Sequence, residues 1–214
     1  MHDRRNLYRT AHRRRAVEST IRLASVDDTE EIQAIYEPHV RDSAVSFELT
    51  PPSAETIEQR IHDTIESHPW LVCERDSEVA GYAYAGPHRS REAYQWAVES
   101  SVYVHQDHQR AGIARGLYES LFEVLELQGF QNVYAGTTLP NPASERFHEA
   151  MGFKSIGVYE KVGYKNGDWH DVKWSQRSLG EQAIAPDPPL SVSKAREHDR
   201  WHSALTTGQS SIQS

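Results

Sequence analysis

Between residues 101 and 129 the pattern of apolar residues changes from that of a strand to that of a helix, and this change most constrains the fold. The run Ser101-Val102-Tyr103-Val104 is rich in β-branched and aromatic residues, which is typical of a strand. From about residue 112 to residue 128, leucines recur at four-residue spacing, which predicts an amphipathic helix that ends at Gly129. The connecting turn therefore exposes the N–H groups of a first helical turn at the positive end of a helix dipole.

The turn itself, residues 108–117, combines small residues with two arginines. Gly112 and Ala114 leave room for a ligand to approach the main chain. Arg110 and Arg115 can add charge-assisted hydrogen bonds. Because anions bind readily at helix N-termini, we predict a cradle for phosphate groups. An ordinary strand-to-helix turn capped by a small residue explains the same spacing, and the turn alone does not separate the two interpretations.

The remaining segments alternate between strand and helix patterns. Ser25-Val26-Asp27-Asp28 resembles a capping box, and Pro51-Pro52-Ser53 and Asn141-Pro142 each begin a further helix. We predict strands over residues 20–23, 70–75, 79–85, 96–104, 131–137, 155–161 and 170–176. This order predicts a single α/β (α+β) domain over residues 20–180, with a mixed, mostly antiparallel sheet of about seven strands flanked by helices.

The composition limits the class of protein and of partner. The formal charge of −8 argues against a general nucleic-acid-binding surface, so we expect no nucleic acid partner. Because Cys73 is the single cysteine, we expect no disulfide framework and no metal cluster, and a reducing, cytoplasmic location fits. The chain has no apolar run of about 18 residues, so we expect no membrane partner.

Both ends of the chain differ in composition from its middle. Residues 1–19 are rich in arginine and poor in apolar residues, which favours a disordered basic extension; a transit peptide and a nucleic-acid-binding arm are the alternatives. Residues 181–214 carry Pro186, Pro188 and Pro189 and then Ser, Thr and Gln with few large apolar residues. From this composition we predict a disordered C-terminal tail.

The turn and its neighbours resemble a known family. The stretch Gln109-Arg110-Ala111-Gly112-Ile113-Ala114 matches the pattern (Q/R)xxGx(G/A) of the acetyl-CoA loop in the GNAT superfamily of N-acetyltransferases. Within that superfamily the chain resembles the phosphinothricin acetyltransferase branch over about residues 21–179. The blocks that carry this resemblance are residues 69–72, 81–87, 93–94, 98–104, 139–141 and 169–172. Several blocks in the right order are more specific than one glycine-containing loop.

The resemblance implies acetyl-CoA as the co-substrate, a splay between the fourth and fifth strands, and a homodimer. The pantetheine arm of the donor would pair with the fourth strand as an added strand does, and its pyrophosphate would meet the loop. Asn141 and Ser144 match family positions near the donor, although Asn141 is also a plain helix cap. The other donor-binding residues that the resemblance implies are Val102, Tyr103, Val104, Arg110, Ala111, Gly112, Ile113, Ala114 and Arg115.

Acetyl transfer from a thioester to an amine requires a base for the ammonium proton and a proton for the departing thiolate. Glu99 is the first candidate base, because strand alternation places it on the face of Ser101 and Tyr103, and the resembled branch assigns its matching Glu this role. A solvated strand carboxylate is the alternative. His148 stands where many members carry a Tyr that protonates the thiolate, so its role stays open between acid, base, substrate contact and a His packed on the sheet.

The acceptor that the branch implies is a small amino acid with an acidic or sulfone-like side chain. Arg91 and Tyr94 match its substrate-side residues. Phe47 would form an apolar wall or a core contact, and Ser101 would lie beside the acceptor. We therefore expect an N-acetyltransferase that moves the acetyl group directly to the α-amine of an amino acid or an analogue such as phosphinothricin, methionine sulfone or methionine sulfoximine. A protein N-terminal acetyltransferase and a non-catalytic acyl-CoA-binding module are the alternatives.

Overall fold

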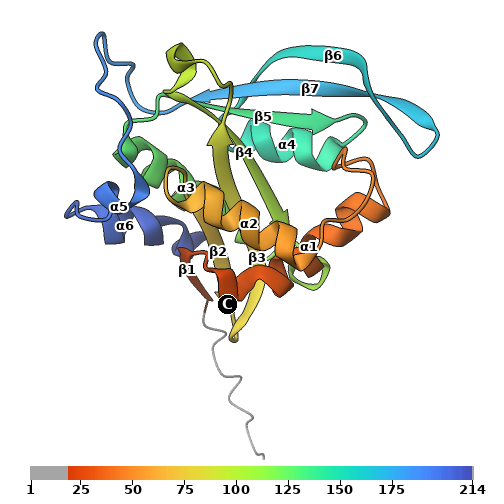
Figure 1. Ribbon diagram of the computed structural model, residues 1–214, viewed down its shortest axis with the longest axis horizontal. Coiled ribbons are helices and arrows are strands. Elements are labelled where there is room, and N and C mark those ends of the chain that lie inside the picture. The colour runs from red at the N-terminus through yellow and green to blue at the C-terminus, as the bar shows by residue number, and fades with distance from the viewer. Residues whose placement is uncertain (1–18, 214) are drawn as a thin grey trace, which may run out of the picture.

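Seven strands form one mixed sheet in the computed structural model, which describes residues 19–213 (Figure 1). The strand order is β1-β2-β3-β4-β5-β7-β6, and every neighbouring pair is antiparallel except β4 and β5. The predicted fold class is therefore confirmed. Apart from Ser19 in β1, the predicted basic extension lies outside the described residues. The strands are β1 (Ser19–Leu23), β2 (Trp70–Arg75), β3 (Glu78–Pro87), β4 (Ala97–Val104), β5 (Asn132–Thr138), β6 (Lys154–Lys165) and β7 (Asp168–Ser178).

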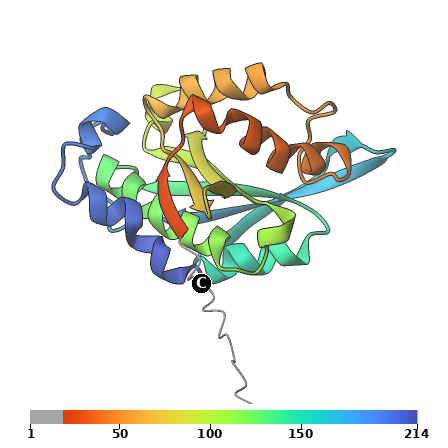
Figure 2. The same cartoon turned by 90° about the horizontal axis from the view of Figure 1, so that it is seen from below.

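Helices cover both faces of this sheet (Figure 2). α1 and α2 bury one apolar cluster, which includes Ile32 and Ile61, and α3 buries the other, which includes Leu117 and Leu121. Each fully buried side chain of this kind contributes about 1.5–3 kcal/mol. The four large helices are α1 (Thr29–Arg41), α2 (Ala54–Ile65), α3 (Ile113–Gln128) and α4 (Pro142–Ala150).

The helix ends lie close to where the sequence predicts them. The side-chain oxygen of Asn141 accepts the N–H of Ser144 at 3.1 Å, and Pro142 takes the first position of α4, where a missing N–H costs nothing. Gly129 ends α3 in the left-handed region, with a φ of 94°. Local sequence thus positions both helices that flank the splay described next.

The sheet opens between β4 and β5, as the family resemblance implies. These parallel strands pair only at Ala97 with Asn132, Val98 with Val133 and Glu99 with Tyr134. Beyond Glu99, the described part of β4 pairs only with β3, along its other edge. The later residues of β4 therefore present unpaired backbone groups to a gap within the sheet.

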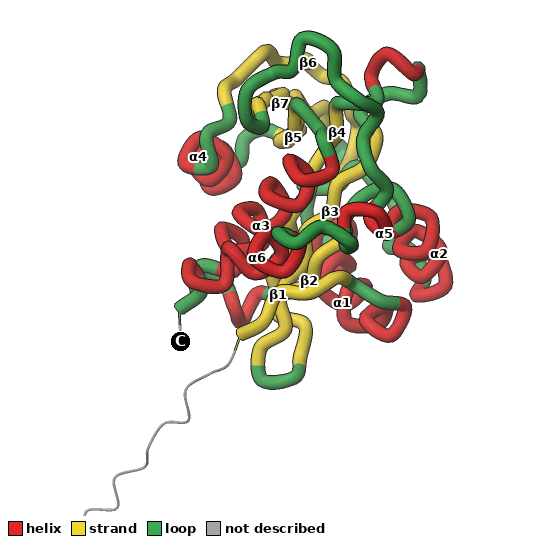
Figure 3. Tube along the Cα trace, turned by 90° about the vertical axis from the view of Figure 1, so that its left-hand side faces the viewer, coloured by secondary structure: helices red, strands yellow, loops and turns green. Residues whose placement is uncertain are grey.

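The predicted disorder of residues 181–214 is wrong for most of that segment. It forms α5 (Val192–Ala195), α6 (Trp201–Thr206) and the 3-10 helix η4 (Thr207–Ser211), and Figure 3 shows α6 alongside α3. Elements of four to six residues are too short to show a hydrophobic period, and docking on α3 stabilises them instead. Val192, Ala195 and Ala204 of the segment are buried, whereas Ile184 and Leu190, which precede α5, are exposed.

The β6–β7 hairpin extends from one edge of the sheet (Figure 1). Asn166 and Gly167 turn it with φ values of 53° and 85°, the left-handed pair that a tight hairpin requires. Apolar side chains on the hairpin are exposed, namely Ile156, Val158, Tyr159, Val162, Tyr164 and Trp169. Within residues 19–213, no helix combines the length and apolar character of a membrane span.

Candidate active site

Two cavities meet at β4, where the strand leaves β5. The α4-side cavity, of about 430 Å³, runs from the loop residues Gln109 and Ala114 to His148. The hairpin-side cavity, of about 460 Å³, contains Glu99 and Phe47. Both cavities are lined by the same five residues at their meeting point, Val45, Ser100, Ser101, Tyr103 and Gly136. Ligands in the two cavities would therefore approach each other across β4.

The loop before α3 has the backbone conformation of an anion cradle. Arg110 and Gly112 both have positive φ values, 63° and 81°, and left-handed residues in such a loop turn successive N–H groups toward one point. The first N–H groups of α3 add the positive end of the helix dipole. The side chains of Arg110 and Arg115 are exposed, and Arg115 lies 3.5 Å from the carboxylate of Glu119. Local structure thus fits phosphate binding at this end of the α4-side cavity.

His148 also lines the α4-side cavity and is buried. Its Nδ1 donates to the carbonyl oxygen of Ser144 at 2.9 Å, so Nε2 is the unprotonated nitrogen, which accepts hydrogen bonds. Burial lowers the pKa of His148 although the bond to Ser144 opposes this effect, so the ring is neutral at neutral pH. The hydroxyl of Tyr118 lies 3.5 Å from Nε2 and accepts from Ser100 at 3.2 Å.

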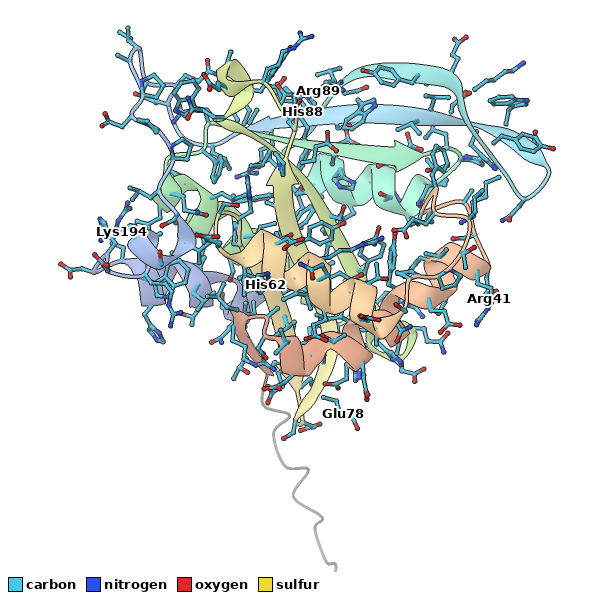
Figure 4. The ribbon with its side chains drawn as sticks, viewed as in Figure 1. Arg41, His62, Glu78, His88, Arg89 and Lys194 are labelled. Carbon is cyan, nitrogen blue, oxygen red and sulfur yellow. The ribbon has the colours of Figure 1, made fainter. Side chains whose placement is uncertain are left out.

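Glu99 opens into the hairpin-side cavity with its side chain 41% exposed. Its carboxylate accepts a hydrogen bond from Nδ1 of His88 at 2.9 Å. The imidazole of His88 stacks on Tyr134, with ring centroids 4.3 Å apart and planes at 14°. Figure 4 labels His88 at the end of the molecule where β6 and β7 lie. The strand β5 thus fixes the ring that orients the carboxylate.

A buried lysine holds the segment between α1 and α2 against the hairpin. The ammonium of Lys165 donates to the carbonyl oxygens of Val40 at 2.6 Å and Ser46 at 2.7 Å. Phe47, next in the chain, lies so close to Gly163 of β6 that a side chain at Gly163 would collide with its ring. Phe47 therefore forms a fixed wall of the hairpin-side cavity while remaining 38% exposed.

The structure does not bring all of the predicted residues into these two cavities. Arg91 and Tyr94 line a third cavity of about 530 Å³, together with Leu190 of the C-terminal segment. The ring of Tyr94 lies 6.1 Å from that of His88, edge to face. Among the predicted residues, Ser101, Tyr103, Asn141, Ser144 and His148 line the α4-side cavity, along with Val102, Val104 and Ala114.

Sequence reasoning missed two side chains of this site. Tyr118 belongs to the apolar stripe of α3, so its position in the pattern indicates only a core residue. His88 directly follows β3, and only the pairing of β3 with β4 brings it beside Glu99. In the described part of the chain, no three His, Cys, Asp or Glu residues form a group that could hold a metal ion.

An anion-cradle loop, an imidazole and a carboxylate around one splayed strand are the groups expected in an enzyme that transfers a group from a phosphate-bearing donor. The chain belongs to the GNAT acetyltransferase family, whose acetyltransferase (GNAT) domain model matches residues 21–174. The family's reaction is the transfer of an acetyl group.

The relatives identify the branch within the family. The chain is 41% identical over 179 residues to the phosphinothricin N-acetyltransferase of Streptomyces viridochromogenes, covering 84% of this chain and 94% of that protein. It is 34% identical to the L-methionine sulfoximine/L-methionine sulfone acetyltransferase of Salmonella typhimurium, over 78% of this chain and 98% of the relative. The crystal structure of a phosphinothricin acetyltransferase from Sinorhizobium meliloti in complex with acetyl-CoA superposes with a TM-score of 0.75, at 30% identity, covering 81% of this chain and 98% of that chain.

Proposed function

We propose that the protein transfers the acetyl group of acetyl-CoA directly to the α-amine of a small amino acid or a close analogue. The observation that carries this proposal is the meeting of the two cavities at β4, with His148 in one and Glu99 in the other. The names of the relatives, which act on phosphinothricin, methionine sulfoximine and methionine sulfone, support the same class of acceptor. An acceptor amine and a thioester in the two cavities need no covalent enzyme intermediate.

The α4-side cavity is the proposed donor site. Its lining fits acetyl-CoA, because it combines Gln109 and Ala114 of the cradle loop with the unpaired edge of Val102, Tyr103 and Val104. The backbone groups of this edge would bond the amides of the pantetheine arm as a neighbouring strand would. Asn141 and Ser144 face the same cavity from α4. The pyrophosphate would bind at the loop N–H groups, with Arg110 and Arg115 beside it.

The two cavities divide the proton transfers between two residues. Glu99 accepts a proton from the acceptor's ammonium group, which frees the nitrogen lone pair. The nitrogen then bonds to the acetyl carbon, and the bond between that carbon and sulfur breaks. His148, neutral and unprotonated at Nε2, takes the second proton from nitrogen and returns it to the thiolate sulfur. Glu99, whose side chain is 41% exposed, releases the first proton to water, so both residues return to their starting states.

The hairpin-side cavity is the proposed acceptor site. Phe47 supplies an apolar wall, and Ser101 lies where the two cavities meet. Arg91 and Tyr94 line the third cavity and not this one. They stay the proposed partners of the acceptor's acidic groups, because the ring of Tyr94 lies edge to face with that of His88, which bonds Glu99. The acceptors named for the relatives, phosphinothricin, methionine sulfone and methionine sulfoximine, are therefore the substrates we propose for this site.

We further propose that the protein is a cytoplasmic homodimer. Apolar side chains that are about half exposed gather on the β6–β7 hairpin, and such a patch is covered in stable assemblies. The single cysteine, Cys73, is buried and unpaired, as a reducing compartment permits. Light scattering at several concentrations tests the dimer, and a monomer at tens of micromolar would contradict it.

The experiment that tests the proposed function measures thiol release from acetyl-CoA with free amino acids, their sulfone and phosphinate analogues, and short peptides. Activity on the analogues supports the proposal, and activity on peptides alone would indicate an N-terminal acetyltransferase. Glu99→Gln should lower kcat by about 10²- to 10⁴-fold, the usual contribution of a general base. Glu78→Gln, at the exposed β2–β3 turn, is the matched control. Unchanged turnover in Glu99→Gln would reject the assigned base.

A further inference from the structure

The last described residues of the chain dock on the loop proposed to bind pyrophosphate. We call residues 207–213 the strap; they follow α6 and include η4. The strap lies beyond residue 174, where the match to the family model ends. It forms no part of the lining of either cavity at β4, so it leaves the proposed donor site open.

The strap holds the loop by its main chain. The N–H of Gln213 donates to the carbonyl oxygen of Ala111 at 2.9 Å. The carbonyl oxygen of Ser211 lies so close to Gly112 that any side chain at position 112 would collide with it. Residue 112 must therefore be glycine for two reasons, its left-handed φ of 81° and this contact.

A second set of contacts fixes the strap along the first turns of α3. The N–H of Gly208 donates to the hydroxyl of Ser120 at 3.1 Å, and the hydroxyl of Ser211 donates to Glu119 at 2.5 Å. Gly116 and Gly208 lack side chains where their backbones meet, and a Cβ on either residue would collide with the other's carbonyl oxygen. Because only glycines fit where the two backbones meet, the strap can dock on α3 in only one alignment.

The bond from Gln213 also controls the direction of an N–H group in the cradle. In a trans peptide the carbonyl of one residue and the N–H of the next point in opposite directions within one plane. Because the strap binds the carbonyl of Ala111, the N–H of Gly112 must point away from the strap. The strap thus fixes a peptide plane in the loop where Arg110 and Gly112 carry positive φ values.

We propose that the strap is a positioning element of the donor site, which makes the enzyme selective for thioesters that carry the pyrophosphate of coenzyme A. This inference rests on the proposed function and extends it to donor choice. A donor without the pyrophosphate does not use the loop and gains nothing from the strap. Intact acetyl-CoA, in contrast, loses one or more hydrogen bonds from the loop to its charged pyrophosphate when the strap no longer holds the loop.

The test compares two variants at one position with two donors. Gln213→Pro removes the N–H that binds Ala111, whereas Gln213→Ala retains it and is the matched control. For Gln213→Pro, kcat/KM with acetyl-CoA should fall about ten- to a hundredfold, the loss of one hydrogen bond to a charged group, through KM more than kcat. With S-acetylpantetheine, which lacks the pyrophosphate, the two variants and the unaltered protein should have equal kcat/KM.

A chain that ends after Thr206 removes the whole strap and should show the same preference more strongly. Calorimetric binding of coenzyme A without any acceptor provides a readout that is independent of turnover, and the affinity should fall by the same factor. Equal affinity in Gln213→Pro and Gln213→Ala would overturn the inference, as would an equal loss with both donors. Absence of thiol release from the unaltered protein with either donor would instead reject the proposed function, and binding would still decide the role of the strap.

Discussion

The bond between His88 and Glu99 offers a direct test of how the proposed base is held. The substitution His88→Phe retains an aromatic ring to stack on Tyr134 but removes the Nδ1–H that lies 2.9 Å from the carboxylate. His88→Asn has the opposite effect, because an Asn amide retains an N–H near that position while the stacking is lost. The pair of variants therefore separates the hydrogen bond from the packing.

The size of the effect follows from the charge and exposure of the bond. A hydrogen bond to a charged group contributes about 1.5–3 kcal/mol when it is buried. The side chain of Glu99 is 41% exposed, so water replaces part of the bond and we use the lower end of that range. A loss of about 1.4 kcal/mol corresponds to a tenfold lower kcat. We expect kcat to fall about tenfold in His88→Phe and about two- to threefold in His88→Asn.

The assay is steady-state thiol release with acetyl-CoA saturating and the acceptor varied. Because His88 acts on the base and not on the donor, KM for acetyl-CoA should stay within twofold in both variants. Thermal unfolding shows whether either variant has lost stability. If His88→Phe retains the kcat of the unaltered protein, or if His88→Asn is the slower of the two, then the hydrogen bond does not position Glu99 and the reasoning is refuted.

The remaining predictions concern stability and pH. Asp28 is buried, and the bidentate bond from Arg22, at 2.7 and 2.8 Å, lowers its pKa although burial alone would raise it. Asp28→Asn should lower the free energy of unfolding by about 1.5–3 kcal/mol at pH 7. Because the folded pKa is lowered, this difference should start to shrink below about pH 4, the ordinary value, and vanish only below the folded pKa; a constant difference in denaturant titrations would contradict it. Leu121→Ala, in the core, should cost about 2–5 kcal/mol, whereas Leu49→Ala, 77% exposed, should change stability by less than about 0.5 kcal/mol in the same titrations. Because burial lowers the pKa of His148, kcat should stay level from pH 8 to about 6.5, its ordinary value, and an acid limb centred above pH 7 would contradict a neutral imidazole.

The main sheet and the large helices were predictable from sequence because each carries its own period and its own end signals. Asn141-Pro142 marks the start of α4, and Gly129 marks the end of α3, without reference to the rest of the chain. The loop at Gly112 was recognisable for the same reason. Local pattern and final fold agree at these points, as they do in sequences that fold to one structure.

Other features depend on contacts between distant residues, and the sequence does not show them. His88 reaches Glu99 only through the register in which Gly86 pairs with Glu99. The strap was mistaken for a disordered tail because its docking depends on two glycines, Gly116 and Gly208, that meet backbone to backbone. Because neither glycine carries a side chain, the backbone of the strap packs directly on α3.

The brief pairing of β4 with β5 has a consequence for the cooperativity of the whole fold. Three residue pairs join the two halves of the sheet at this seam, compared with seven between β3 and β4. Opening of such a seam requires less free energy than global unfolding, so amide hydrogens near it exchange with solvent through local opening. A donor that spans the gap and bonds main-chain groups of β4 ties the seam by mass action. The two halves of the sheet then unfold together, so the bound donor contributes to the cooperativity of unfolding.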